Sequence, residues 1–185
     1  LGSLASGLAH EIRNPLGSIA GSVRLLSANR QLSEEDRQLC IIIQRETERL
    51  NELVTDMLDL AKARAPVPTE VDVVALVEEV VALVSASGRA ASDVRVQYVG
   101  RCKTAVILAD SAQLRQLVWN LVRNAVQASS AGDTVEVSIE HMPNSQVCMT
   151  VKDEGAGIDP AIIPRLFDPF YTTRSHGSGI GLAVV

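Results

Sequence analysis

Apolar residues recur every three or four positions through two long stretches in the first third of this 185-residue chain. The first stretch contains Leu1, Leu4, Leu8, Ile12, Leu16, Ile19, Val23 and Leu26. This spacing places apolar side chains on one face of an α-helix, where they can be buried together. We therefore expect one helix, with a single buried stripe, that runs to about Ala28.

A second helix is expected after a polar turn, with Ser33 as its cap and Asp36 as the partner acid in the first turn. Its larger apolar residues recur at seven-residue spacing and give it a seam like that of a coiled coil. They are Ile43, Leu50 and Met57, with Thr47, Val54 and Ala61 between them. Two helices joined by a short turn cannot close a core alone, so we predict a dimeric four-helix bundle. The alternative is a hairpin that packs on the rest of its own chain.

Two prolines end this helical pattern. Pro66 and Pro68 remove backbone donors and favour extended neighbours, so residues 65–69 form a linker after residues 1–64. The pattern of residues 70–185 is mixed, which predicts an α+β fold with a helix-and-sheet sandwich. We expect helices near 73–86 and 110–129, the second with Asp110 as its cap, and strands near 94–99, 104–108, 134–141 and 146–152, the last two joined by a turn at Pro143 and Asn144.

The composition excludes several classes of function. A net charge of −5 and the lack of a run of basic residues argue against nucleic-acid binding. No apolar stretch approaches the roughly 18 to 20 residues that span a bilayer, so we expect no membrane contact within this chain and a cytoplasmic location. Cys40, Cys102 and Cys148 are odd in number and lack metal-ligand spacing, so we expect small apolar core residues in a reducing compartment.

The first helix contains an unusual stretch, AHEIRNPL, at residues 9–16. His10 is two residues from both Leu8 and Ile12, which turns it about 200° away from the apolar stripe and predicts that it is exposed. An isolated histidine is usually an ordinary surface residue. Here Glu11 can hold one ring nitrogen and leave the other as a lone pair that attacks an electrophile.

Two further residues support this interpretation of the stretch. Asn14 is four residues from His10 on the same face, where its amide can hold a water molecule. Pro15 leaves the carbonyl of Glu11 without its helical partner, so we expect a bend there. A zinc protease would need a second histidine at position 14, so we reject that function.

Glycines in two places indicate sites for a ligand. In DEGAG, Asp153 is an acceptor suited to an exocyclic amine, and Gly155 and Gly157 allow close approach to the backbone, although such a turn is often an ordinary loop. In GSGIG, three glycines precede an apolar run that looks helical and can offer N–H groups to phosphate. These are Gly177, Gly179 and Gly181.

Two asparagines on the helix expected near 110–129 are candidates for a cation site. Asn120 and Asn124 are four residues apart on one face. A side-chain amide oxygen can ligate a hard cation such as magnesium. The alternative is a solvated polar face.

Taken in order, the motifs HEIRNPL, NLVRNA, DEGAGI, LFDPFYTT and GSGIGL resemble the homology boxes of sensor histidine kinases of two-component systems, most closely those of the nitrogen-sensor type. The resemblance implies a dimerisation and phosphotransfer hairpin at residues 1–64. It also implies an ATP-binding domain with the Bergerat fold at residues 70–185. In relatives a further helix and strands complete this domain, so we expect it to be truncated after Val185.

The resemblance also implies roles for the individual residues. His10 would accept the γ-phosphoryl group of ATP with Glu11 as base, and Asn14 would serve the reverse, phosphatase-type reaction. Asn124 would ligate Mg²⁺ beside Asn120. The adenine pocket would consist of Asp153, Gly155 and Gly157. The triphosphate would lie along Gly177, Gly179 and Gly181 under a mobile lid, flanked by Phe167 and Phe170, which could equally be core anchors.

The implied partners are a second copy of the chain and the receiver domain of a response regulator, whose aspartate would take the phosphoryl group near His10. A membrane anchor could precede Leu1. One residue departs from the family pattern, since Gln127 stands where many relatives carry a lysine near the phosphates. Arg123 could supply that contact.

Two other functions compete with the kinase. ATP hydrolases with the same nucleotide fold carry a glutamate one turn before the metal-binding asparagine, and here that position is Asn120, whose amide cannot act as a base. A non-catalytic, dimeric nucleotide-sensing module is the second alternative, although it would have no use for the pair of His10 and Glu11.

Overall fold

The computed structural model describes residues 2–29, 31–61, 65–86, 94–173 and 179–183, with the backbone alone for residues 2–10, 52, 56 and 59–61. The described chain forms two compact units. The first contains a helical hairpin together with the described residues of 168–183, and the second contains two sheets and two helices.

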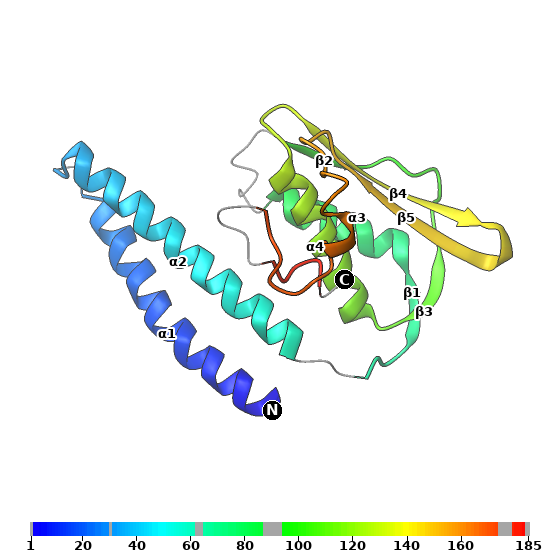
Figure 1. Ribbon diagram of the computed structural model, residues 1–185, viewed down its shortest axis with the longest axis horizontal. Helices are drawn as coiled ribbons and strands as arrows, with labels where there is room; N and C mark the ends of the chain where they lie inside the picture. The colour runs from blue at the N-terminus through cyan, green and yellow to red at the C-terminus, as the bar shows by residue number, and fades with distance from the viewer. Residues whose placement is uncertain (1, 30, 62–64, 87–93, 174–178, 184–185) are drawn as a thin grey trace. The chain divides into compact units, whose positions relative to one another are not determined.

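The hairpin consists of α1 (Gly2–Ser27) and α2 (Glu34–Ala61), which pack along one another (Figure 1). The predicted cap of α2 is confirmed. Ser33 Oγ accepts a hydrogen bond from the Asp36 N–H at 3.0 Å and donates to the Asp36 carboxylate at 2.7 Å. This reciprocal pair fixes the start of α2, because each partner satisfies the other.

The apolar residues of the hairpin divide into two stripes. Buried residues are spaced along both helices, and they are Leu16, Val23, Cys40, Thr47 and Leu58. A second stripe is 40 to 56% exposed and contains Ile12, Ile19, Leu26, Ile43, Leu50 and Met57. The expectation of a single buried stripe on α1 is therefore wrong within one chain, because one partner helix covers only one side of the apolar face.

The second unit contains a three-stranded sheet in the order β2-β4-β5, formed by β2 (Arg95–Tyr98), β4 (Thr134–Met142) and β5 (Gln146–Lys152). β2 is parallel to β4, and β4 is antiparallel to β5. A separate antiparallel pair is formed by β1 (Thr69–Asp72) and β3 (Val106–Ala109). The helices of this unit are α3 (Val73–Ala86) and α4 (Ser111–Ala128).

The core of the second unit lies between the helices and one face of the larger sheet (Figure 1). Residues of β4 alternate between buried and partly exposed from Thr134 to Ile139, as expected for a strand with one covered face. The most buried side chains come from both helices and from β4, and they are Val77, Val80, Val118, Val122, Val135, Val137 and Ile139. The predicted helix-and-sheet sandwich is therefore confirmed.

Three details differ from the sequence-based expectation. β1 was not predicted, because TEVD has no strong strand signal and becomes a strand by pairing with β3. Residues 181–183 form a turn, whereas a helix was expected after the glycine-rich segment. Cys40 is buried as predicted, but Cys148 is exposed on β5, and all three cysteines are free. The turn at Asn144 is confirmed and has a φ of 69°.

Candidate functional site

The stretch around His10 lies within α1, whose helical backbone continues through Pro15. The side chain of His10 lies outside the described residues. Glu11 and Asn14 are exposed, as a site open to a partner requires. Arg13 Nη2 donates to Thr55 Oγ1 on α2 at 3.0 Å. This bond fixes the turn between Glu11 and Asn14 to the second helix, and the apolar periodicity gave no indication of it.

The helix α4 carries the two asparagines on a firmly held frame. Asp110 caps it, because Asp110 Oδ1 accepts from the N–H groups of Ala112 at 3.0 Å and Gln113 at 3.1 Å. Asn120 is only 6% exposed, and Asn124 is half-buried one turn later. A buried amide is costly unless it is hydrogen-bonded, so burial orients Asn120 more strictly than a solvated face would.

The DEGAG turn follows β5 directly and packs against the end of α4. The Gly155 N–H donates to Asp153 Oδ1 at 3.0 Å. A Cβ on Gly155 would lie 2.8 Å from the carbonyl carbon of Ala128 and would also overlap its oxygen. Gly157 has a φ of +76°, a conformation that glycine adopts without strain. Both glycines are therefore required by the backbone of the turn.

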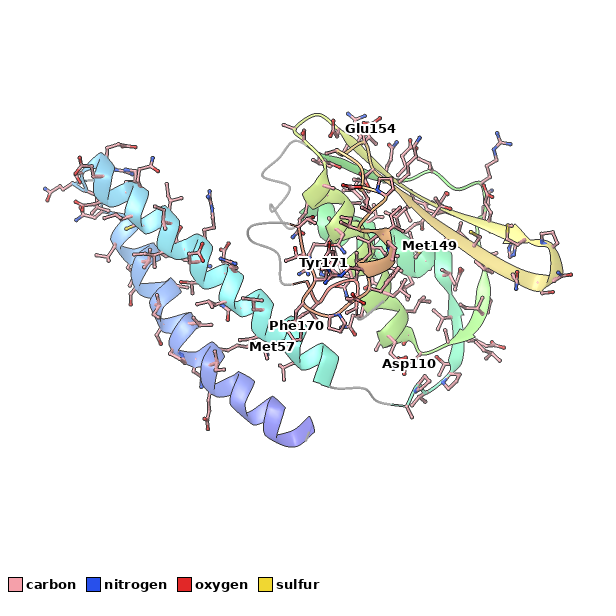
Figure 2. The ribbon with its side chains drawn as sticks, viewed as in Figure 1. Met57, Asp110, Met149, Glu154, Phe170 and Tyr171 are labelled. Carbon is pink, nitrogen blue, oxygen red and sulfur yellow. The ribbon has the colours of Figure 1, made fainter. Side chains whose placement is uncertain are left out.

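This contact brings the turn close to the metal-ligand candidate. Ala128 is one helical turn beyond Asn124, a rise of about 6 Å along the axis. Asp153 and Asn124 thus belong to one region at the end of α4. Glu154 Oε2 accepts from the Thr134 N–H at 3.0 Å and ties the same turn to the start of β4 (Figure 2). Nothing in the sequence indicated this contact of Glu154, apart from its place in DEGAG.

A backbone contact joins Phe170 to Gly179. The Phe170 N–H donates to the Gly179 carbonyl at 2.8 Å, and a Cβ on Gly179 would lie 2.5 Å from the Phe170 carbonyl carbon. Both residues have a φ of 65°. Figure 2 labels Phe170, the donor of this hydrogen bond, and Tyr171. Gly177 lies outside the described residues, and Gly181 is buried.

The two phenylalanines are not core residues. Phe167 and Phe170 are each 62% exposed. A core anchor would be largely buried, so exposed rings favour the interpretation in which they flank a segment that covers a ligand.

The region at the end of α4 has oxygen ligands that suit a hard cation, but too few of them to hold one alone. The described residues contain no cluster of three histidine, cysteine or carboxylate side chains that could hold a metal ion. The amide oxygens of Asn120 and Asn124 are hard ligands, but two amides leave most positions of an octahedral ion to other oxygens. The site therefore fits a cation that arrives with a phosphate ligand.

No helix within the described ranges combines the length and apolarity needed to cross a membrane.

Two family models match the chain in succession. Residues 1–66 match the His Kinase A (phospho-acceptor) domain, and residues 109–185 match the histidine kinase-, DNA gyrase B- and HSP90-like ATPase. The chain is 35% identical over 186 residues to the signal transduction histidine-protein kinase AtoS of Escherichia coli (strain K12), covering all of this chain and 30% of that protein. It is 32% identical over 185 residues to the sensor histidine kinase ZraS of Salmonella typhimurium, covering 40% of that protein.

Solved structures agree with these matches. Full-length ShkA in complex with AMPPNP has a TM-score of 0.70 and 28% identity, over 98% of this chain and 39% of that one. The histidine kinase ThkA in complex with the response regulator protein TrrA has a TM-score of 0.65 and 28% identity, over 94% of this chain and 51% of that one. The chain spans 30 to 40% of the length of AtoS and ZraS.

Proposed function

Since this chain belongs to the sensor histidine kinases, we propose that it transfers the γ-phosphoryl group of ATP to His10 and then to an aspartate of a response regulator. The observation that carries this proposal is the contact of Gly155 with Ala128. It joins the candidate adenine-binding turn to the helix that carries both asparagines. A phospho-acceptor helix and a nucleotide site of this kind are the two parts that phosphoryl transfer from ATP to histidine requires.

His10 is the proposed nucleophile. One ring nitrogen attacks the γ-phosphorus, the bond from that phosphorus to the β–γ bridging oxygen breaks, and ADP leaves. Glu11 accepts a hydrogen bond from the N–H of the other ring nitrogen and takes this proton as positive charge develops on the ring, which leaves the imidazole ring neutral in the product. The product is a phosphoramidate, whose P–N bond is readily cleaved by a carboxylate. Arg13 supports this turn through its bond to Thr55.

The end of α4 and the DEGAG turn form the proposed ATP site. Asp153 would accept a hydrogen bond from the adenine amino group. Gly155 and Gly157 would shape the pocket, because Gly155 lets the turn approach Ala128 and Gly157 has open space beside it. The bond between Gly155 N–H and Asp153 Oδ1 supports this role, because it fixes the carboxylate in the turn. By the resemblance of their motif, Gly177, Gly179 and Gly181 would line the triphosphate, and the exposed Phe167 and Phe170 would flank the lid that covers it.

Asn124 is the proposed ligand of Mg²⁺, and Asn120 lies beside it. When bound, the ion would neutralise charge on the phosphate oxygens. The burial of Asn120 supports the arrangement, because its amide is held in place before ATP arrives. Gln127 is exposed on the next turn of α4 and Arg123 is half-buried, so either can reach towards a phosphate from this helix.

Two partners are proposed. The first is a second copy of the chain, which would cover the half-exposed stripe of the hairpin in a dimeric four-helix bundle. The second is the receiver domain of a response regulator, and the reported complex of ThkA with TrrA supports this choice. Asn14, exposed one turn from His10, would hold the water that removes the phosphoryl group from the regulator.

We also propose boundaries, subclass and location. Residues 1–64 are the phosphotransfer hairpin, 65–69 the linker and 70–185 the ATP-binding domain. The motifs HEIRNPL and PFYTT favour the nitrogen-sensor type. The three free cysteines and the requirement for ATP are consistent with a cytoplasmic reaction.

The test is to incubate the protein with γ-labelled ATP and magnesium and to assay for acid-labile, base-stable label. We expect label that is lost in His10→Ala and in Asn124→Ala. His141→Ala is the matched control, because His141 lies on β4 with its ring against the Thr104 carbonyl, and it should label normally. Steady phosphate release that persists in His10→Ala would support a hydrolase instead. Tight nucleotide binding without label would support a sensing module.

A further inference from the structure

The linker has a single backbone donor between Ala65 and Thr69. Positions 66 and 68 are prolines, which have no N–H, so Val67 alone can donate there. The Val67 N–H donates to Asp110 Oδ2 at 2.9 Å. Figure 2 shows Asp110 at the start of α4. One side chain therefore holds the last residues of the linker against the helix that carries Asn120 and Asn124.

The two carboxylate oxygens of Asp110 have different partners. Oδ1 accepts from the first N–H groups of α4, and Oδ2 accepts from the linker. Both sets of bonds are made to an ionised acceptor, which makes them stronger than bonds between neutral groups. The cap and the linker contact can therefore be separated by a change that affects only one oxygen.

The topology explains why a side chain is needed here. β1 and β3 pair from Asp72↔Val106 to Thr69↔Ala109. The next position on β1 is Pro68, which has no donor, and the next on β3 is Asp110, where the chain turns into α4. The backbone ladder cannot continue past Thr69. The carboxylate of Asp110 takes the place of the next rung and extends the attachment by two residues, to Val67.

We propose that Asp110 is a positioning residue for phosphoryl transfer, because it attaches two more linker residues to the ATP-binding domain and so shortens the tether, the length of chain between this domain and the hairpin. This rests on the function proposed above. With the bond in place, the tether from Ala61 to Val67 has six residue steps and a maximal reach of about 20 Å. Without it the tether reaches Thr69, with eight steps and about 27 Å.

A shorter tether increases the rate of an intramolecular reaction. The effective concentration of a tethered group falls roughly as the −3/2 power of the tether length, so releasing Val67 should lower the effective concentration of the ATP site near His10 roughly 1.5-fold. Loss of orientation adds to this, because phosphoryl transfer requires the attacking and leaving atoms to be in line. We expect a total fall of roughly twofold to fivefold in the autophosphorylation rate.

Asp110→Asn tests the proposal, because asparagine is as good a helix cap as aspartate. Its amide oxygen can keep the bonds to Ala112 and Gln113, while its NH₂ group cannot accept from Val67. We expect the rate of His10 labelling at saturating ATP to fall, with the KM for ATP and the melting temperature unchanged. We also expect faster hydrogen exchange at the Val67 amide and unchanged exchange along α4.

Three other variants make the test specific. Glu70→Gln removes the same charge from an exposed position on β1, and Val67→Ala keeps the N–H, so both should label at the normal rate. Val67→Pro removes the donor and leaves the cap, and it should reproduce the fall. Combining it with Asp110→Asn should cause no further loss.

The outcomes separate this inference from the proposed function. If the unchanged protein labels His10 and Asp110→Asn labels at the same rate, only the positioning role is overturned. A fall in Asp110→Asn that Val67→Pro does not share also overturns it, since the effect then comes from the cap. If the unchanged protein takes no label on His10, the proposed function fails, and the positioning role fails with it.

Discussion

The hairpin and the second unit both bury apolar side chains, but they do so to different degrees. In the second unit the central side chains, such as Val77, Val122 and Val137, are fully buried between two helices and a sheet. In the hairpin the most buried apolar residues retain 6 to 7% exposure, and a whole stripe stays about half exposed. Two layers around a sheet close a core, whereas two helices cover only one side of each other. The central core of the second unit is thus closed among its own described elements, whereas the half-exposed stripe of the hairpin is the surface that the proposed second copy would cover.

The largest effect is expected from a charged substitution in the buried core of the second unit. Val122→Asp places a charge at a site with no solvent exposure, and we expect a loss of about 4 kcal/mol or more in the free energy of unfolding of the second unit. ATP binding should be lost with the fold. Denaturant unfolding and nucleotide titration measure both effects. Leu83→Asp, on α3 and 50% exposed, is the control and should cost about 1 kcal/mol or less.

The next largest effect is expected from charged substitutions on the half-exposed stripe of the hairpin. Ile19→Glu combined with Leu50→Glu places charges on the half-exposed stripe, where each residue is 46% exposed. We expect the dimer dissociation constant to rise roughly 100-fold or more, because both charges would be buried in the bundle. Sedimentation measures the assembly, and melting of the second unit should not change.

A control separates the stripe from the surface of the hairpin in general. Leu25 is 79% exposed and lies off the stripe, so Leu25→Glu should leave the dimer intact. If the unchanged protein is already a monomer at micromolar concentration, the dimer prediction is wrong. The alternative hairpin, packed on its own chain, would then be supported.

Substitution of one glycine in each unit tests the same difference in packing. Gly155→Ala forces a Cβ against the backbone of Ala128, which cannot move without disturbing α4, so we expect a loss of about 1 to 3 kcal/mol and weaker ATP binding. Gly21→Ala lies in α1 with nothing within 4 Å of the new Cβ, and it should stabilise the hairpin by about 1 kcal/mol. Thermal melting of each variant shows whether the substitution raises or lowers the melting temperature. Equal signs at the two positions would contradict the difference in packing.

The sequence predicted the parts of the fold that depend on local pattern. The caps at Ser33 and Asp110 and the strand near 134–141 follow from short-range chemistry and local pattern, and all are confirmed. β1 was missed because its stability comes from pairing with a strand more than 30 residues away. The division of the α1 apolar residues into buried and exposed stripes was missed because periodicity does not show how many neighbours a helix has.

The candidate site was predictable to a similar extent. Motifs indicated Asp153, Gly155, Asn120 and Asn124 separately, but the close approach of Gly155 to Ala128 is a tertiary contact that spacing cannot reveal. Arg13 and Glu154 were missed for the same reason, since their partners lie on other elements. Asp110 was predicted as a helix cap, but its hydrogen bond to Val67 was not predicted. An aspartate at the start of a helix indicates the cap, and nothing in the local sequence indicates what its second carboxylate oxygen binds.

The smallest expected effect is a dependence of the second unit on pH. Asp72 Oδ1 accepts from the Ala105 N–H at 3.0 Å and from the Val74 N–H at 3.1 Å, which ties β1 to β3 and to the start of α3. The hydrogen bond from Ala105 is the main cause that holds the pKa of Asp72 below its ordinary value of 3.8. Partial desolvation opposes this shift of the pKa. Hydrogen bonds from the Thr104 side chain and the Val74 and Ala75 backbone add to it.

A lowered pKa in the folded state means that the unfolded state binds the proton more readily. The stabilisation from the Asp72 charge is therefore fully present above pH 3.8 and is lost as the pH falls through the lower pKa of the folded state. Asp72→Asn keeps one acceptor oxygen but has no charge to lose. We expect the free energies of unfolding of the two proteins to differ most near neutral pH and to converge in acid. Denaturant unfolding across this range measures the difference, in which the titration of the other carboxylates cancels. A difference that stays constant into acid would show that the bonds at Asp72 depend on its shape and not on its charge.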